Sequence, residues 1–323
     1  MLPPLTFEPL LKRIRWGGRR LGTLLGKPID RETDYAESWE IADHAEGQSR
    51  VADGPFEGIT LSELMQAHGP ELLGRQAGLK QFPLLIKFLD ANDWLSLQVH
   101  PDDRLAKRYS PSENGKTEAW VIIDAQPDSR ICAGLKEGVT EVELRESLKT
   151  GMTEELLHFV SVAAGDCLFI PAGTVHAIGP GIVLAEVQQQ SNLTFRLHDW
   201  GRVDSNGKPR TIHVAESLAC TNFARGPVSP VQPVIMRDSS HSFEELIRCD
   251  YFVIRRHQSG DSFRMPDDDR FRILMALEGE GSIETTDGIA AFSKGATVLV
   301  PACSRDIRIV PRRRLNLLEI SHP

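Results

Sequence analysis

A motif that occurs twice constrains the fold of this chain more than any other feature. Residues 165–176 read GDCLFIPAGTVH and residues 295–306 read GATVLVPACSRD, with the first glycine, the proline and the next alanine in register. Each copy places an apolar run between a turn glycine and a proline. That pattern predicts a β-strand ending at a tight corner, because proline cannot continue a central ladder. In the first copy the corner is followed by His176, a candidate metal ligand at a strand edge.

A second pair of segments supports a repeat of one larger unit. Residues 120–131 can be aligned with residues 272–283, and the offset is 22 residues larger than that of the first motif. This difference is about the size of a helical insertion predicted between Lys136 and Leu157. The sequence therefore predicts two copies of one β unit, the first enlarged by helices.

Four residues of the first copy form a candidate metal site. Gln98 and His100 are two apart on a predicted strand, so their side chains leave the same face. Glu118 on the next strand and His176 at the corner complete a set of nitrogen and hard oxygen donors without thiolate. Such a set suits zinc or another divalent first-row ion, and its single negative charge leaves the ion able to polarise a carbonyl or hydroxyl oxygen. The alternative is four ordinary hydrogen-bonded side chains, since glutamine is an uncommon metal ligand.

The second copy lacks this set. In the alignment Asp306 stands opposite His176, and Arg270 stands opposite Glu118. Arg255 is the residue aligned with Gln98. We therefore expect the second copy to be a structural partner, with the chemistry confined to the first.

Basic residues surround the candidate ligands in the sequence. They are Lys116, Arg196, Arg202, Lys208 and Arg210. Asp199 and Asp204 are interleaved with the last four, so one interpretation is a solvated loop whose charges pair with each other. The other is a clamp for a phosphate or an oxyanion, in which arginine supplies a two-pronged grip.

Charge and cysteine content exclude several classes of function. The formal net charge is −8, so binding to nucleic acid or to a membrane surface is not expected, because phosphate groups are repelled on average. The five cysteines are widely spaced without a CxxC pair, which predicts reduced thiols rather than a disulfide framework. The first twenty residues contain no apolar run long enough for a signal peptide or a membrane span, so a cytoplasmic protein is expected.

The pattern of apolar runs and turn residues predicts how the chain is divided. Helical insertions are expected at about 57–79, 136–157 and 212–222, with capping boxes at Thr60 to Glu63 and Thr140 to Glu143. A further capped helix is expected near Thr153. The segment 226–233 holds three prolines in eight residues and is the predicted linker. The expected domains are therefore residues 1–225, which carry the candidate site, and residues 234–323, which do not.

Several long motifs in order resemble one enzyme family. They are LIKFLDANDWLSLQVHPDD (85–103), NGKTEAW (114–120), PAGTVHAIGPGIVLAEVQQQSNLTFRLHDWGR (171–202) and GKPRTIHVAESL (207–218). These segments closely resemble the type I mannose-6-phosphate isomerases, especially the short bacterial form. The likeness extends over nearly the whole chain, from the WGG at Trp16 and the ESWEIADH at 37–44 into the C-terminal block.

The resemblance implies a mainly β bicupin with helical insertions, that is, two β-barrel or jelly-roll domains and a small helical region, the second cupin degenerate. It implies reversible conversion of mannose 6-phosphate into fructose 6-phosphate by proton transfer through an enediol, in a monomer or a homodimer. The implied site has one Zn²⁺ per chain, or another divalent ion, and two sets of residues. The metal ligands are Gln98, His100, Glu118 and His176, and the active-site residues are Arg196, Glu186 and Lys116.

One position departs from the family pattern. Gly115 stands where the longer bacterial and the eukaryotic enzymes tend to carry a histidine, so the role of that histidine does not transfer. Two other functions stay open from the sequence. One is a sugar-phosphate-binding bicupin without catalysis. The other is a metal-dependent oxygenase on the same fold, disfavoured because its basic cluster would have no use and its usual ligands are two histidines and a carboxylate.

Overall fold

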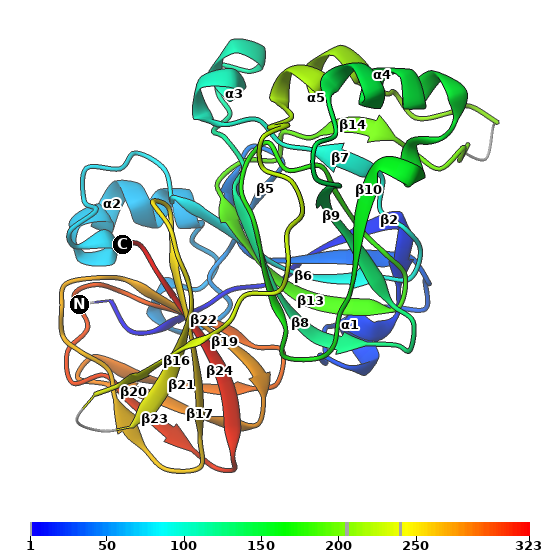
Figure 1. Cartoon of the computed structure of the whole chain (residues 1–323). Coiled ribbons are helices and arrows are strands. Elements are labelled where there is room, and N and C mark those ends of the chain that lie inside the picture. Colours follow the sequence, from blue (N-terminus) through cyan, green and yellow to red (C-terminus); the bar gives the residue numbers. More distant parts are fainter. Residues whose placement is uncertain (1, 204–206, 239–240) are drawn as a thin grey trace.

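The computed structural model describes residues 2–203, 207–238 and 241–323. The chain is mainly β, as predicted, and it forms two halves that each consist of two facing sheets (Figure 1). No helix in the described ranges is long and apolar enough to cross a membrane. All five cysteines are free.

The N-terminal half pairs a six-stranded sheet with a five-stranded one. The first has the order β11-β8-β13-β6-β3-β2, with β2 (Leu10–Gly18), β3 (Tyr35–Ile41), β6 (Leu84–Ala91), β8 (Glu118–Ala125), β11 (Cys167–Ile170) and β13 (Ile182–Gln189). The second has the order β10-β9-β12-β7-β14, with β7 (Leu97–Val99), β9 (Arg130–Leu135), β10 (Leu157–Ser161), β12 (His176–Ile178) and β14 (Phe195–His198). Buried side chains from both sheets, among them Trp120, Leu184 and Ile131, form the core between them. A short hairpin of β4 (Asp43–His44) and β5 (Gly47–Gln48) adjoins this half.

The C-terminal half pairs a seven-stranded sheet with a four-stranded one. The first has the order β1-β22-β19-β24-β17-β16-β15, with β1 (Leu5–Thr6), β15 (Val234–Arg237), β16 (Ser242–Arg248), β17 (Val253–Ser259), β19 (Arg272–Glu278), β22 (Thr297–Val300) and β24 (Leu315–Ser321). The second has the order β18-β23-β20-β21, with β18 (Phe263–Arg264), β20 (Glu280–Thr285), β21 (Gly288–Ser293) and β23 (Arg308–Pro311). The first strand of the chain therefore belongs to the C-terminal sheet, across the predicted domain boundary.

The strand orders of the two halves coincide, which confirms the repeat. Six strands of the larger N-terminal sheet, β11-β8-β13-β6-β3-β2, match β22-β19-β24-β17-β16-β15 of the C-terminal one. In the smaller sheets, β10-β9-β12-β7 match β21-β20-β23-β18. The unit seen in the sequence is thus a whole two-sheet barrel.

The strand registers correct two details of the sequence alignment. Glu118 lies opposite Ile170, whereas Arg272 lies opposite the equivalent Val300, so the counterpart of Glu118 is Arg272 and not Arg270. A slip of two residues keeps every side chain on its face of a strand, so the apolar pattern does not detect it.

The alignment of Gln98 with Arg255 is wrong for a different reason. Arg255 lies on β17, the counterpart of β6, whereas the counterpart of β7, which carries Gln98, is β18.

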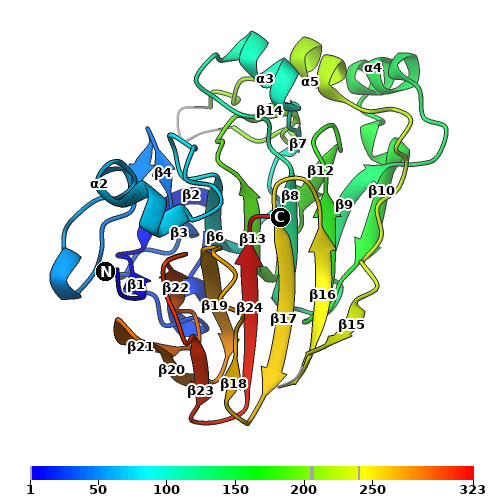
Figure 2. The ribbon, with the colours of Figure 1, turned by 90° about the vertical axis from the view of Figure 1, so that its left-hand side faces the viewer.

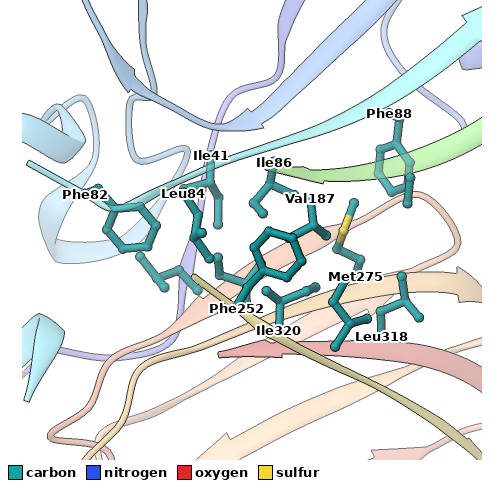
Figure 3. Close-up of a cluster of buried hydrophobic side chains, with 14 of the residues drawn as sticks. Ile41, Phe82, Leu84, Ile86, Phe88, Val187, Phe252, Met275, Leu318 and Ile320 are labelled. Atoms are coloured by element: carbon teal, nitrogen blue, oxygen red, sulfur yellow. The ribbon is translucent and has the colours of Figure 1, made fainter. Parts of the chain in front are cut away.

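The two halves pack through the outer faces of their larger sheets. Figure 3 shows Ile86 and Val187 facing Met275 and Leu318, and all four belong to one buried cluster. Strands β6 and β13 are consequently buried at every position, on one face by this interface and on the other by the N-terminal barrel core. Their nearly continuous apolar sequences follow from burial on both faces.

Helices cover one end of the N-terminal barrel and one side of the interface. They are α1 (Arg20–Thr23), α2 (Leu61–Leu73), α3 (Asp103–Tyr109), α4 (Glu141–Thr150) and α5 (Val214–Cys220), with 3₁₀ turns η1 (Gly54–Phe56) and η2 (Thr153–Leu156). In both views α3, α4 and α5 lie beside β7 and β14 (Figure 1, Figure 2). The predicted capping boxes of α2 and α4 are present. The capped helix expected near Thr153 is wrong: η2 is one short turn without a side-chain cap.

A buried ion cluster occupies the C-terminal barrel at the place corresponding to the candidate site. Glu186 lies opposite Trp120, and Glu319 lies opposite Leu274 in the corrected register, so Glu319 is the counterpart of Glu186. Its carboxylate contacts Arg272 Nε at 2.9 Å and His257 Nε2 at 3.0 Å. In this cluster the guanidinium of Arg272 provides the positive charge beside Glu319. Arg272 occupies the strand position that Glu118 holds in the first copy.

This cluster predicts a specific loss of stability in acid. Burial favours a raised pKa for Glu319, but the hydrogen bond from His257 and the charges of His257, Arg272 and Arg255 lower the pKa to about 2, from a usual 4.5. A carboxyl with a lowered pKa stabilises the fold fully above pH 4.5 and loses that contribution as the pH falls towards 2, here about 3 kcal/mol.

Glu319→Gln should therefore destabilise the protein at pH 7 by about 3–5 kcal/mol, because the buried charge of Arg272 keeps only Asp268, a partly exposed partner at 2.6 Å. It should also flatten the decline of unfolding free energy between pH 4.5 and pH 2, measured by urea denaturation. Glu284→Gln, at a partly exposed carboxylate of the same half, is the control. A variant whose stability declines with acid as steeply as that of the wild type would contradict the assignment.

Candidate functional site

The candidate residues converge at one end of the N-terminal barrel. Strand β7 lies between β12 and β14, and Gln98 lies directly opposite both His176 and Arg196. Glu118 is the first residue of β8 on the facing sheet, and Glu186 lies in the middle of β13. The short strands and the corner at Pro171 therefore bring together residues that are up to 98 positions apart in the chain.

Three of the predicted metal ligands form a compact buried cluster. His100, Glu118 and His176 each offer a ligand atom, and these atoms lie within 4.8 Å of one another. His100 Nδ1 is 2.9 Å from the carbonyl oxygen of Leu193, and His176 Nδ1 is 2.9 Å from that of Thr174. Each Nδ1–H is thus donated to the backbone, which leaves the lone pair of each Nε2 turned towards Glu118. This outer hydrogen bonding is typical of histidines that ligate a metal.

The charge state of the cluster also fits a divalent cation. Burial and the nearby Lys116 lower the pKa of His100 to about 3, and burial lowers the pKa of His176, so both rings are neutral at pH 7. Burial alone would raise the pKa of Glu118, but the Lys116 ammonium and His100 hold it well below its usual value. Neutral imidazoles and an ionised carboxylate are the forms that bind metals.

The carboxylate oxygens of Glu118 provide a further test of whether these residues fit a metal ion. Both are buried. Oε1 is paired with the ammonium of Lys116 at 2.5 Å, whereas Oε2, which lies 3.6 Å from His176 Nε2, accepts no hydrogen bond from the residues that the structure describes. A buried carboxylate oxygen without a partner is costly, and a bound cation would compensate it. The residues present therefore fit a metal ion.

Gln98 completes the set on the cavity side. Its amide nitrogen is 3.3 Å from His176 Nε2, and its amide oxygen is 3.4 Å from the hydroxyl of Ser96. A half-turn of an amide exchanges its nitrogen and oxygen, so the same position can offer an oxygen donor. Gln98 thus lies beside the cluster, and its role as a fourth ligand stays a prediction.

Lys116 lies beside the cluster, as predicted. Its Nζ is 2.5 Å from Glu118 Oε1 and 3.3 Å from His100 Nε2. The side chain is buried but reaches the cavity wall together with Gln98. This position allows its ammonium to act on a bound substrate as well as on Glu118.

Glu186 belongs to a buried network that the sequence interpretation identified only in part. Its Oε1 accepts a hydrogen bond from Trp120 Nε1 at 2.9 Å, and its Oε2 is 3.3 Å from the ammonium of Lys87. Lys87 also contacts Glu37 at 3.4 Å. Burial and the charge of Glu118 raise the pKa of Glu186, against the effect of Lys87.

Lys87 is the functional candidate that sequence reasoning missed. It interrupts the apolar run LLIKFLDA of β6, every residue of which is buried. A lysine inside a fully buried strand is rarely found without a partner, so the interruption itself was a usable signal. Neighbouring carboxylates raise its pKa although burial opposes this, which keeps it charged.

Several of these side chains line one cavity of about 470 Å³. Gln98, Lys116, Lys87, Glu186 and Arg196 all line it. The Nε donor of Arg196 is buried and has no hydrogen-bond partner within the described part of the chain, whereas its Nη1 donates to the carbonyl oxygen of Thr211. The cavity is therefore lined by a titratable carboxylate and fixed cations, and two of its lining residues, Gln98 and Lys116, contact the candidate metal cluster behind its wall.

The structure shows the self-paired interpretation of the basic loop for part of its residues, and the clamp stays a prediction for those that line the cavity. Arg202 and Arg210 pair with the same carboxylate, Asp199, and Arg202 also contacts Asp93 at 3.3 Å. Arg202 is thus a self-paired loop residue, while Arg210 and Arg196 line the cavity. Lys208 is absent from the cavity lining, and Asp204 lies outside the described residues.

Comparisons with known proteins agree with this geometry. A family model described as "Phosphomannose isomerase type I, catalytic domain" matches residues 5–121. The chain is 38% identical over 300 residues to mannose-6-phosphate isomerase ManA of Bacillus subtilis, covering 92% of this chain and 93% of the relative. It is 35% identical over 301 residues to the mannose-6-phosphate isomerase of Streptococcus mutans, covering 93% of each. The solved structure of a mannose 6-phosphate isomerase from Bacillus subtilis superposes with a TM-score of 0.90 at 31% identity over the whole of both chains.

Proposed function

Because the chain belongs to the type I phosphomannose isomerases, we propose that it interconverts mannose 6-phosphate and fructose 6-phosphate in the cavity described above. The observation that carries this proposal is that the cavity lined by the buried Glu186 lies next to the cluster of His100, Glu118 and His176, which Gln98 and Lys116 of the cavity wall contact. A coupled assay of fructose 6-phosphate formation, run beside metal analysis, tests it. Metal-loaded protein that binds the sugar phosphate without turnover would show a binding protein instead.

We propose Zn²⁺ as the ion and Gln98, His100, Glu118 and His176 as its ligands. Nitrogen and oxygen donors without thiolate are compatible with zinc, and the neutral imidazoles are ready to bind it. When bound, the ion supplies a Lewis acid for the oxygen atoms at C1 and C2 of the substrate. Burial of the ligands and the backbone bonds to both rings hold the site in shape without the substrate.

The reaction moves a proton between C1 and C2 through an enediol, so it needs a group that both takes and returns a proton. We propose Glu186 for this role. Its carboxylate lines the cavity, and burial and the charge of Glu118 raise its pKa, which brings it closer to the pH at which a general base works best. Trp120 holds one oxygen of Glu186, and Lys87 lies at the other.

Lys116 is proposed as a second proton donor or as a contact for the substrate. Its ammonium is fixed 2.5 Å from Glu118, so it lies at the junction between the metal cluster and the open cavity. A donor placed there can protonate a developing alkoxide or hold the phosphate end of the sugar.

Arg196 is proposed to stabilise the negative charge that develops on the enediol oxygens. Its buried Nε–H has no partner within the described residues, and the side chain is held by Thr211. Donors that are fixed in advance and aimed at a developing oxyanion provide large stabilisation of a transition state.

Arg196→Ala should lower kcat by roughly 10²-fold or more, as the loss of one oxyanion donor does in other enzymes. Steady-state kinetics with mannose 6-phosphate measures the effect, and Arg145→Ala on the exposed face of α4 is the control. A turnover number close to that of the wild type would exclude this role for Arg196.

A further inference from the structure

A chain of hydrogen bonds runs from the C-terminal half to the segment that carries Lys116. It begins at Tyr251, in the connection between β16 and β17, whose hydroxyl donates to Asp103 Oδ2 at 2.8 Å. The other oxygen, Asp103 Oδ1, accepts from the backbone N–H of Gly115 at 2.8 Å and from Gln189 Nε2 at 3.1 Å. Gln189 Oε1 in turn accepts the backbone N–H of Thr117 at 2.9 Å.

These bonds hold the backbone on both sides of Lys116. The amide before it is bound by Asp103, the amide after it by Gln189, and its own N–H donates to the carbonyl oxygen of Pro101 at 3.0 Å. The regular ladder of β8 starts only at Glu118, so the ladder does not fix Lys116 itself. Side-chain bonds from Asp103 of α3 and Gln189 of β13 hold it, together with the backbone bonds from Lys116 to Pro101 and from Gln189 N–H to the carbonyl oxygen of Thr117 at 3.2 Å.

Gly115 shows how closely this segment lies against α3. A Cβ atom built on Gly115 would be 2.5 Å from the backbone nitrogen of Asp103, a distance that no side chain tolerates. The departure from the family pattern at this position thus has a steric reason in this chain: only glycine lets residues 115–117 reach the carboxylate of Asp103.

Tyr251 is suited to remain a hydrogen-bond donor. Burial, the hydrogen bond to Asp103 and the charge of that carboxylate raise the pKa of its phenol, so the hydroxyl stays protonated at neutral pH. A hydrogen bond to an ionised acceptor is roughly twice as strong as one between neutral groups. Both oxygens of Asp103 are engaged, one by each half of the molecule.

We infer that Tyr251 and Asp103 are positioning residues for Lys116, through which the C-terminal half sets the geometry of an active site to which it contributes no ligand. This inference rests on the proposed function. Lys116 acts at 2.5 Å from Glu118, and a misplacement of about 1 Å at an active site can cost about 10²-fold in rate. The tyrosine is therefore a part of the catalytic apparatus supplied by the degenerate copy.

Tyr251→Phe removes only the hydroxyl and keeps the ring. We expect kcat to fall about 5–10-fold with little change in KM, and Asp103→Asn to lower kcat by about tenfold or more, because it weakens the contacts to both halves. Tyr109→Phe is the matched control, since the hydroxyl of this half-exposed tyrosine on α3 makes no hydrogen bond to the described residues.

A double-mutant cycle separates positioning from general stability. If Tyr251 acts through Lys116, then Tyr251→Phe should not lower the residual kcat of a Lys116→Ala enzyme, although it lowers that of the wild type. An equal fall in both backgrounds would overturn the inference, and so would an unchanged kcat in the single variant. Melting temperature and metal content, measured on each variant, show that the protein tested is folded and loaded.

The hydrogen-exchange rate of the Gly115 amide tests the inference without any measurement of enzyme turnover. The Gly115 amide should exchange at least about tenfold faster in Tyr251→Phe than in the wild type. In the control variant Tyr109→Phe, the exchange rate of the Gly115 amide should equal that of the wild type. If the wild type fails to convert mannose 6-phosphate, the proposed function fails, and the exchange rate still decides whether Tyr251 orders this segment. Unchanged exchange at Gly115 would overturn the inference whatever the activity.

Discussion

His176→Ala should abolish isomerase activity and reduce the bound metal from about one ion per chain to almost none. The reason is that His176 Nε2 lies within 4.8 Å of the ligand atoms of His100 and Glu118, with its ring fixed by Thr174, and no other His, Cys, Asp or Glu in the described part of the chain belongs to this cluster. Loss of a tightly bound ion should also lower thermal stability, because an ion present at about 1,000 times its Kd contributes about 4 kcal/mol.

Elemental analysis, a coupled activity assay and a thermal melt on one preparation measure these effects together. His68→Ala on α2 is the control, since that ring pairs with Glu71 on the surface. Chelator treatment of the wild type should reproduce the result, and added Zn²⁺ should restore activity to the wild type but not to His176→Ala. A metal-free preparation with full activity would refute the metal assignment.

Glu186→Gln should lower kcat by about 10²–10⁴-fold, the usual contribution of a general acid–base group, with a much smaller change in KM. Glutamine keeps the shape and the oxygen that accepts from Trp120 Nε1, so the variant removes the ionisable group and little else. The incorporation of solvent deuterium at C1 and C2 of the sugar phosphates should fall in parallel, because it reports the proton transfer directly.

The repeat supplies the matched control for this experiment. Glu319 is buried at the corresponding position of the C-terminal barrel and is hydrogen-bonded within an ion cluster. Glu319→Gln should lower stability and leave kcat unchanged at temperatures well below its melting transition. If Glu186→Gln also retained kcat and deuterium exchange, the proton-transferring group would have to be another residue of the cavity.

The proximity of the proposed ligands was predictable, because strand geometry alone determines most of it. Gln98 and His100 share a face by their spacing, and the proline corner accounts for the place of His176. These are local relations within a few residues. The predictions that failed concern elements whose local sequence pattern is weak, such as the short turn η2, which was predicted as a capped helix.

Other parts of the site depend on contacts that no local pattern encodes. The position of Lys87 in an apolar run indicates that it has a partner, but only the pairing of β6 with β13 and β3 shows that the partners are Glu186 and Glu37. The sequence alignment was wrong by two residues and so missed Arg272 as the counterpart of Glu118. A shift of two residues leaves every side chain on the same face of its strand, so the apolar pattern does not reveal it. Tyr251 belongs to the other half and meets Asp103 across 148 positions of sequence, a distance over which spacing rules predict nothing.

The sheet that carries Glu118 and Glu186 is covered on its outer face by the C-terminal half, through Ile86 and Val187 against Met275 and Leu318 (Figure 3). Removal of the C-terminal barrel would expose this apolar sheet face to water, whatever side chains the barrel carries in its own interior. Strand β1, paired with β22, ties the start of the chain to the same barrel. The C-terminal barrel therefore contributes to this protein as a cover for the sheet that carries the site, a contribution that needs no ligands of its own.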